Sequence, residues 1–162
     1  MAAAFSVRLA DYRRPSDAAA LVMLLDAYAS DPAGGGEPLS DHARSHLVSE
    51  LAARPQAFSI LAFDGDLPVG LVNCIEGFST FKCKPLVNVH DVAVLASHRG
   101  RGIAEAMLAE AERIAVERGA VKMTLEVLSG NVPAVKLYRR IGYEGYQLDP
   151  AMGTAQFFQK WL

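Results

Sequence analysis

The residues with the clearest chemistry lie in one turn, Arg99-Gly100-Arg101-Gly102, which follows an apolar run and precedes a long amphipathic segment. The first turn of a helix presents backbone N–H groups without intrahelical partners and the positive end of the helix dipole, so it is suited to an anion. Glycines let the backbone approach the anion, and arginines add positive charge. The turn lacks the P-loop signature and the third glycine of a dinucleotide fold. It therefore indicates a short diphosphate site, with a purely steric use of glycine as the alternative.

A second cluster lies near the end of the chain, where Asn131 precedes a predicted helix, Pro133–Ile141. Ala134 and Tyr138 are four residues apart and share one face of that helix. A phenol has an ordinary pKa of ~10, so it stays protonated at neutral pH and can donate its proton. A tyrosine that only packs against a sheet is the alternative.

Three residues on predicted central strands could accept a proton: His90, Asp91 and Glu126. Each lies in an otherwise apolar run, where a polar side chain is costly unless it has a partner. In a regular strand His90 and Asp91 point to opposite faces, so only one of them faces a reacting group unless a bulge redirects them. Structural hydrogen bonding is the alternative for each.

The elements that must position these residues alternate in a mixed α/β pattern. The predicted helices are a first one that begins at Pro15 and includes Ala18–Ala29, a second capped by Ser40 and ending near Arg54, Arg101–Arg118 and Pro133–Ile141. The predicted strands are Phe5–Ala10, Phe58–Phe63, Val69–Phe78, Leu86–Leu95, Val121–Leu128, Tyr143–Tyr146 and Gln156–Trp161. A glycine-rich link, residues 31–38, separates the first two helices.

Composition limits the class of protein. A chain of 162 residues with 51% hydrophobic residues fits one domain, residues 1–162. Its net charge of −2 argues against nucleic-acid binding. Two cysteines without metal-ligand spacing predict neither a metal site nor a disulfide framework. Without a basic leader or a run of about 18 apolar residues, the chain is predicted to be cytoplasmic and not to bind a membrane.

The order of elements and the two clusters resemble the GCN5-related N-acetyltransferase (GNAT) superfamily. Its pyrophosphate motif, Arg/Gln-x-x-Gly-x-Gly/Ala, is matched here by Arg99-x-x-Gly102-x-Ala104. The resemblance implies a GNAT fold of the α/β (α+β) class: a mixed, mostly antiparallel, splayed sheet of about six or seven strands flanked by about four helices. It also implies an acyltransferase that uses acetyl-CoA as cosubstrate and needs no metal.

The same resemblance implies roles for individual residues. Backbone groups of Val92, Ala93 and Val94 would bind the pantetheine arm, Asn131 would hold the cofactor near its thioester, and Tyr138 would be the general acid. The pyrophosphate would be wrapped by the turn, consisting of Arg99, Gly100, Arg101, Gly102, Ile103 and Ala104.

The base and the acceptor stay open at this level. Glu126 matches the position of a catalytic glutamate in ribosomal-protein N-terminal acetyltransferases, and it ranks equal with His90 as the base. Asp91 follows as an orienting group. The segment from Phe78 to Asp91 is similar to the diamine and thialysine acetyltransferase branch, but His90 stands where a glutamate is usual there.

Acidic residues in and beside the glycine-rich link favour a cationic acceptor, which we expect to be a small primary amine, such as a diamine or an amino-acid-like compound. These residues are Asp31, Glu37 and Asp41. The alternatives are a protein N-terminal α-amine acetyltransferase and a CoA-binding sensor without transfer chemistry. The resemblance to the family also implies a homodimer.

Overall fold

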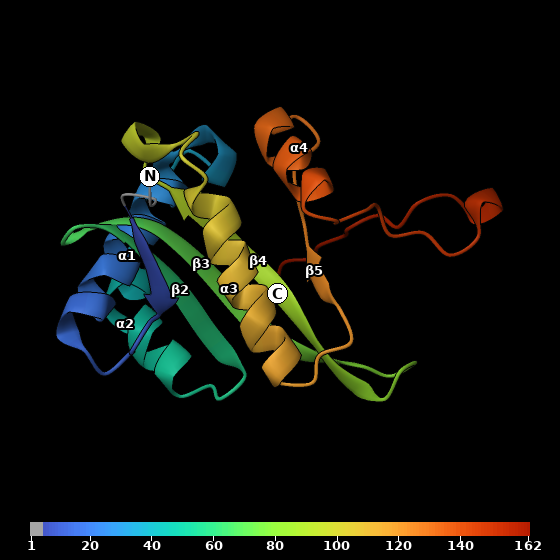
Figure 1. Cartoon of the computed structure of the whole chain (residues 1–162), viewed down its shortest axis with the longest axis horizontal. Coiled ribbons are helices and arrows are strands. Elements are labelled where there is room, and N and C mark those ends of the chain that lie inside the picture. Colours follow the sequence, from blue (N-terminus) through green and yellow to red (C-terminus); the bar gives the residue numbers. More distant parts are fainter. Residues whose placement is uncertain (1–4) are drawn as a thin grey trace. The chain divides into compact units, whose positions relative to one another are not determined.

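The computed structural model describes residues 5–162, which form two compact units, Met1–Leu125 and Glu126–Leu162. The first unit holds one sheet and most of the helices (Figure 1). Its strands are β1 (Ser6–Leu9), β2 (Ala57–Asp64), β3 (Leu67–Ser79), β4 (Lys84–Val94) and β5 (Met123–Leu125). Its helices are α1 (Pro15–Ser30), α2 (Asp41–Ala52) and α3 (Ile103–Glu117), with 3-10 turns at Pro32–Gly34 and Ala96–His98.

The sheet has the order β1-β2-β3-β4-β5, with antiparallel pairs from β1 to β4 and a parallel pair between β4 and β5. The predicted mixed and mostly antiparallel sheet is confirmed, and so are four α-helices. The described residues form five strands instead of the six or seven that we expected.

The helices cover both faces of this sheet. Leu61, Leu71 and Ala93 are cross-strand neighbours on β2, β3 and β4, and they pack against Leu21 and Leu24 of α1. Gly70 lies on the other face, because it neighbours Leu71 along the strand. A Cβ at Gly70 would lie 2.8 Å from Met107 Cε of α3, so this helix packs directly on the backbone. Figure 1 shows α3 on the face opposite α1 and α2.

The strand predictions fail at the end of the chain. The strand expected at Val121–Leu128 contains only Met123–Leu125, and the strands expected at Tyr143–Tyr146 and Gln156–Trp161 do not form. A strand needs a neighbour that completes its backbone hydrogen bonds, and alternation of side chains supplies none. Tyr146 and Trp161 stay exposed in this part of the chain, at 54% and 88%.

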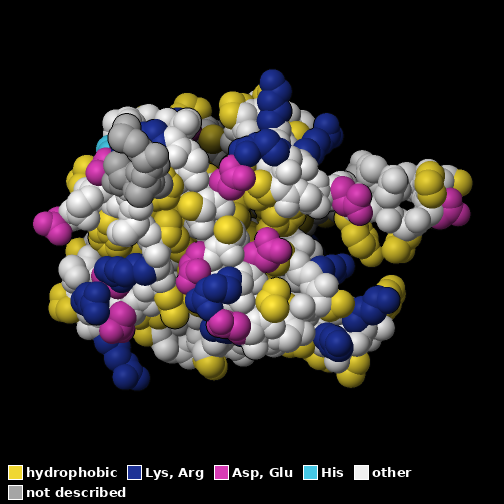
Figure 2. All heavy atoms as spheres, in the orientation of Figure 1, with side chains coloured by type: hydrophobic (Ala, Val, Ile, Leu, Met, Phe, Trp, Pro, Cys, Tyr) yellow, Lys and Arg dark blue, Asp and Glu magenta, His cyan; other side chains and the backbone are white. Residues whose placement is uncertain are grey.

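The second unit contains α4 (Val132–Arg140) and a 3-10 turn at Pro150–Met152. Asn131 is the N-cap of α4, and its side-chain oxygen accepts the Ala134 N–H at 3.4 Å. Figure 2 shows Lys and Arg side chains gathered over this helix, where Lys136, Arg139 and Arg140 are exposed. Across the described residues, no helix combines the length and the apolar character that crossing a bilayer requires.

A buried ion pair fixes the junction between β1 and α1. The Asp17 side chain is 1% exposed, and its two oxygens accept from Arg8 Nη1 and Nη2 at 2.6 and 2.7 Å. Asp17 also accepts the Asp11 N–H at 2.9 Å. The hydrogen bonds from Arg8 lower the pKa of Asp17, so this stabilisation is present at neutral pH and lost as the pH falls through the lowered pKa.

Replacing Asp17 with Ala should lower the free energy of unfolding by about 2–3 kcal/mol, because a buried acceptor of three hydrogen bonds is removed and Arg8 loses its partner. Urea unfolding at pH 7 measures the change. Glu50→Ala is the control, because it breaks the exposed Arg54–Glu50 pair and should leave the midpoint nearly unchanged. Equal midpoints for the two variants would contradict a structural role for Asp17.

Candidate active site

The glycine turn opens the N-terminus of α3. Gly100 and Gly102 have φ values of 76° and 80°, in the left-handed region that favours glycine. Gly102 is the N-cap of α3 and offers no side chain to cap the first N–H groups. A Cβ built on either glycine meets no protein atom within 4 Å. The start of the helix therefore faces open space with its dipole uncompensated by a cap, which is the arrangement an anion site requires.

The two arginines of the turn are ion-paired with carboxylates from elsewhere in the first unit, Asp31 in the glycine-rich link and Asp64 at the end of β2. Arg99 Nη2 lies 2.8 Å from Asp31 Oδ2, and its Nε donates to Val94 O at 3.1 Å. Arg101 Nη1 lies 3.0 Å from Asp64 Oδ2, which His98 Nε2 also approaches at 3.3 Å. The charge of both guanidinium groups is thus partly compensated, and the backbone is the part of the turn that is open to an anion.

The strand that leads to this turn has an open edge. β5 pairs with β4 only at residues 87–89, whereas β4 continues to Val94. Leu95 N–H donates to Val69 O at 2.9 Å, so the backbone groups of alternate residues, Val92 and Val94, point to the opposite edge. Within the first unit, no strand other than β3 pairs with β4 at these two residues. The Val94 carbonyl accepts Arg99 Nε, and the other backbone groups on this edge can bind an extended ligand.

A bulge at His90 redirects the polar residues of β4. Asp91 pairs with Asn73 and Val89 pairs with Cys74, so His90 is the additional residue between them. Asn88 pairs with Ile75, two residues from Asn73, and Asn88 and Asp91 therefore share a face. This is the face that α1 covers at Ala93.

His90 joins the same face. Its Nδ1 lies 2.5 Å from Asn88 Oδ1, while Asn88 Nδ2 donates to Thr124 Oγ1 at 2.9 Å. Because Asn88 Oδ1 can only accept, His90 Nδ1 is the donor and Nε2 keeps a lone pair in the neutral ring. His90 is exposed, so Nε2 can accept a proton from a ligand. The opposite orientations expected for a regular strand do not occur, and the bulge is the reason.

Asp91 lies among groups that stay neutral near pH 7. Burial raises the pKa of the Cys74 thiol to about 12, and the Asp91 charge contributes to this rise. Burial also raises the pKa of Tyr28 on α1, and Asp91 contributes again. The Asp91 carboxylate itself is half-buried and accepts Asn73 Nδ2 at 3.0 Å.

The remaining predicted site residues belong to the second unit. Tyr138 is 9% exposed, and its ring meets the Tyr143 ring edge-on with centroids 5.9 Å apart. Asn131 caps α4, as its place before the helix indicates. Glu126 is exposed and follows the last residue of β5, so it does not lie on a strand as expected. The roles of these residues stay predictions.

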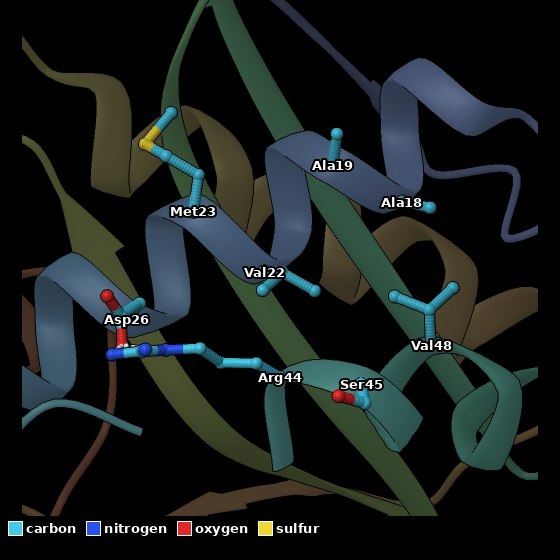
Figure 3. A pocket seen from close by; sticks show the side chains of 8 residues that line it. All are labelled: Ala18, Ala19, Val22, Met23, Asp26, Arg44, Ser45 and Val48. Atoms are coloured by element: carbon cyan, nitrogen blue, oxygen red, sulfur yellow. Dashed lines mark hydrogen bonds and ion pairs between the residues drawn. The ribbon is translucent and has the colours of Figure 1, made fainter. Parts of the chain in front are cut away.

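A hollow of about 480 Å³ lies between α1 and α2, away from these residues. In Figure 3, Arg44 reaches from α2 to Asp26 on α1, and the two are 3.1 Å apart. Val22 and Val48 supply apolar lining. The hollow contains none of the candidate catalytic or cofactor-binding residues, so the site is defined by β4 and its turn.

The sequence analysis missed the polar residues that support β4. Ser59 and Asn73 are buried at 0% and 5% exposure, and Asn88 holds His90. The sequence does contain an indication of them, because each is a polar residue inside an apolar strand, where it requires a partner. Only the register of the strands shows which residues are the partners.

The site residues thus lie along an open strand edge that leads through a left-handed glycine turn into an uncapped helix. The profile of the acetyltransferase (GNAT) family matches residues 21–143, most of the chain. The chain therefore belongs to the acetyltransferase (GNAT) family.

Curated relatives match parts of the chain. A streptothricin acetyltransferase from Streptomyces lavendulae is 41% identical over 71 residues, which cover 43% of this chain and 38% of the relative. An N-alpha-acetyltransferase from Sulfurisphaera tokodaii is 32% identical over 104 residues, covering 60% of this chain and 62% of the relative. The chain thus spans less than two thirds of the length of these relatives.

Solved structures share the fold over more of its length. A probable acetyltransferase has a TM-score of 0.77 at 23% identity, covering 88% of this chain and 91% of the other. The aminoglycoside acetyltransferase AAC(6')-Iy, solved with the bisubstrate analog CoA-S-monomethyl-acetylneamine, has a TM-score of 0.74 at 18% identity, covering 98% and 99%. At these identities the likeness shows the fold alone.

The Arg99–Asp31 pair ties the glycine turn to the link after α1. The hydrogen bond from Arg99 lowers the pKa of Asp31, so the carboxylate is ionised at neutral pH. The contact is therefore present at neutral pH and is lost as the pH falls through the lowered pKa.

Replacing Asp31 with Asn should loosen the link at pH 7, because the amide can still cap the Ala33 N–H but carries no charge for the ion pair. Amide exchange at Gly34 and Gly36, which donate to Asp31 O, should become faster by ~3–10-fold. Hydrogen exchange read by NMR measures this, with Asp41→Asn as a control at an exposed carboxylate. Unchanged exchange in Asp31→Asn would show that the ion pair does not hold the link.

Proposed function

We propose that the protein is an acetyl-CoA-dependent N-acetyltransferase that acts on a primary amine of a small molecule. The observation that carries the proposal is the continuity of the open β4 edge with the glycine turn at the start of α3. The β4 edge offers backbone groups to an extended ligand, and the glycine turn at its end offers an anion site. Such a combination fits a ligand with an extended amide-bearing arm and a diphosphate.

The residues present fit acetyl-CoA. The Arg99 to Ala104 turn would hold the diphosphate through the N–H groups of the α3 N-terminus, since no side-chain cap competes for them. Val92 and Val94 would bind the amides of the pantetheine arm as a neighbouring strand would. Asn131 and Tyr138 would act near the sulfur end of the cosubstrate. When bound, acetyl-CoA supplies the acetyl thioester.

The amine must lose a proton before it can react, because an alkylammonium has an ordinary pKa of ~10.4. His90 Nε2 and the Asp91 carboxylate share the face on which this proton would be removed. The amine nitrogen then forms the C–N bond as the C–S bond breaks. Tyr138 would give its phenolic proton to the departing sulfur.

The relatives support a small-molecule acceptor, since the names of several give streptothricin acetyltransferase or aminoglycoside acetyltransferase. The second candidate is protein N-terminal acetylation, which the match to an N-alpha-acetyltransferase favours. Glu126 would be the base in that case. A single domain, a homodimer and a cytoplasmic location complete the proposal.

Release of the CoA thiol from acetyl-CoA across a panel of amines tests this function. The panel contains streptothricin, an aminoglycoside, a diamine, amino acids and a peptide with a free N-terminus. We expect a small cationic amine to give the highest kcat/KM, and Tyr138→Phe to lower turnover by ~10²-fold with cofactor affinity unchanged. A peptide that outcompetes every small amine would favour the second candidate. Binding of acetyl-CoA without turnover of any acceptor would indicate a sensor.

The anion site is tested by Gly102→Ala. A Cβ at a φ of 80° strains the turn by ~1–2 kcal/mol and displaces the N–H groups, so the Kd for CoA should rise by ~10-fold. Gly119→Ala is a matched control, because Gly119 has a φ of 75° at the other end of α3 and also has open space around it. Calorimetric titration with CoA compares the two. Equal affinities would show that the turn does not bind the diphosphate.

A further inference from the structure

A row of buried polar side chains crosses the sheet and ends at Asp91. Ser59, Asn73 and Asp91 are directly paired across β2, β3 and β4. Ser59 Oγ donates to Asn73 Oδ1 at 2.6 Å, and Asn73 Nδ2 donates to Asp91 Oδ2 at 3.0 Å. At the other end, Tyr12 Oη lies 2.8 Å from Ser59 Oγ. Four residues from four parts of the first unit therefore form one hydrogen-bonded chain.

The hydrogen bonds of this row all run in one direction. A hydroxyl carries one proton, and Ser59 uses its proton on Asn73, so Tyr12 must be the donor to Ser59. Burial raises the pKa of Tyr12, which keeps this phenol protonated. Every donor in the row thus points toward the Asp91 carboxylate. Hydrogen bonds aligned in this way polarise one another and favour the charged form of the final acceptor.

The row stabilises the Asp91 carboxylate through only one of its two oxygens. Within residues 5–162, Asn73 is the one side chain bonded to the Asp91 carboxylate, and it occupies Oδ2. Apolar residues in place of Ser59, Asn73 and Asp91 would avoid the free-energy cost of burying polar groups. A row that ends on a half-buried carboxylate with Oδ1 left over is the arrangement expected for receiving a cation.

We propose that Asp91 Oδ1 receives the acceptor ammonium and that Asn73, held by Ser59 and Tyr12, is a positioning residue for this carboxylate. The inference rests on the proposed acetyltransferase function and specifies its acceptor as a cationic primary amine. One proton passes from the ammonium nitrogen to Asp91, and the freed lone pair forms the C–N bond as the C–S bond of the thioester breaks. The second proton that the nitrogen loses is balanced by the proton that Tyr138 would give to the departing sulfur. His90, on the same face, is a neighbour of the reacting nitrogen and not the primary base.

Two titratable groups near Asp91 do not change charge below pH 8. Burial raises the pKa of Tyr28 on α1 and of Cys74, which lies on the other face of β3, so both stay neutral. His90, also on β4, is a further titratable group on this face. Substitution of His90 therefore separates its titration from that of Asp91.

The test measures kcat/KM for the best amine between pH 4 and 9, together with the Kd for CoA. Asn73→Leu should lower kcat/KM by ~30–100-fold at pH 7 and leave the Kd for CoA unchanged. The fall of kcat/KM at acidic pH, the acid limb of the profile, should shift to higher pH, because the Asp91 carboxylate loses a hydrogen bond. Ser59→Ala and Tyr12→Phe should shift it in the same direction with ~3–10-fold losses. Cys74→Ala, on the same strand but the other face, is the control for packing.

The outcomes distinguish this inference from the function on which it rests. No turnover by the wild type overturns both. Turnover by the wild type with an unchanged rate and pH profile in Asn73→Leu overturns the positioning role alone, and so does a loss that Cys74→Ala reproduces. An acid limb that disappears in His90→Gln and persists in Asp91→Asn would assign the proton to His90 and overturn the inference.

Discussion

The site depends on one additional residue in β4. The bulge at His90 changes the register against β3, so Asn88, His90 and Asp91 all reach the face that α1 covers. Without it, regular alternation would send His90 and Asp91 to opposite sides of the sheet. The same strand then continues to Val94 with an open edge and ends at the glycine turn. A single β-bulge thus places on one strand both the groups that we propose for proton transfer and the open edge that we propose for the cofactor.

Side-chain hydrogen bonds connect this strand to the rest of the first unit. Asp17 and Arg8 fix the junction of β1 and α1, and Asp17 also holds the backbone of Asp11, next to Tyr12. Tyr12 begins the hydrogen-bonded row that ends at Asp91. The part-buried salt bridge therefore holds the backbone next to the residue at which this row begins.

Different kinds of groups are proposed for binding the cofactor and for choosing the acceptor. In the function that we propose, cofactor binding would rely on backbone N–H groups of a helix start and on a strand edge, which many sequences of one family can build. Choice of the acceptor would rely on side chains, among them Asp91 and His90, whose positions depend on their neighbours. Membership of the acetyltransferase (GNAT) family therefore leaves the acceptor to be decided by residues outside the pyrophosphate motif.

The sequence by itself determined what is local. Apolar periodicity, the Ser40 cap and the glycine turn predicted four helices, the central strands and the anion site, because turn and cap chemistry acts over a few residues. Tertiary structure decided what depends on partners. Alternation at residues 156–161 formed no strand without a neighbour, and Arg99 found Asp31, 68 residues away. The register of β3 against β4 brought Asn73 to Asp91, since pairing between strands is a property of the folded sheet.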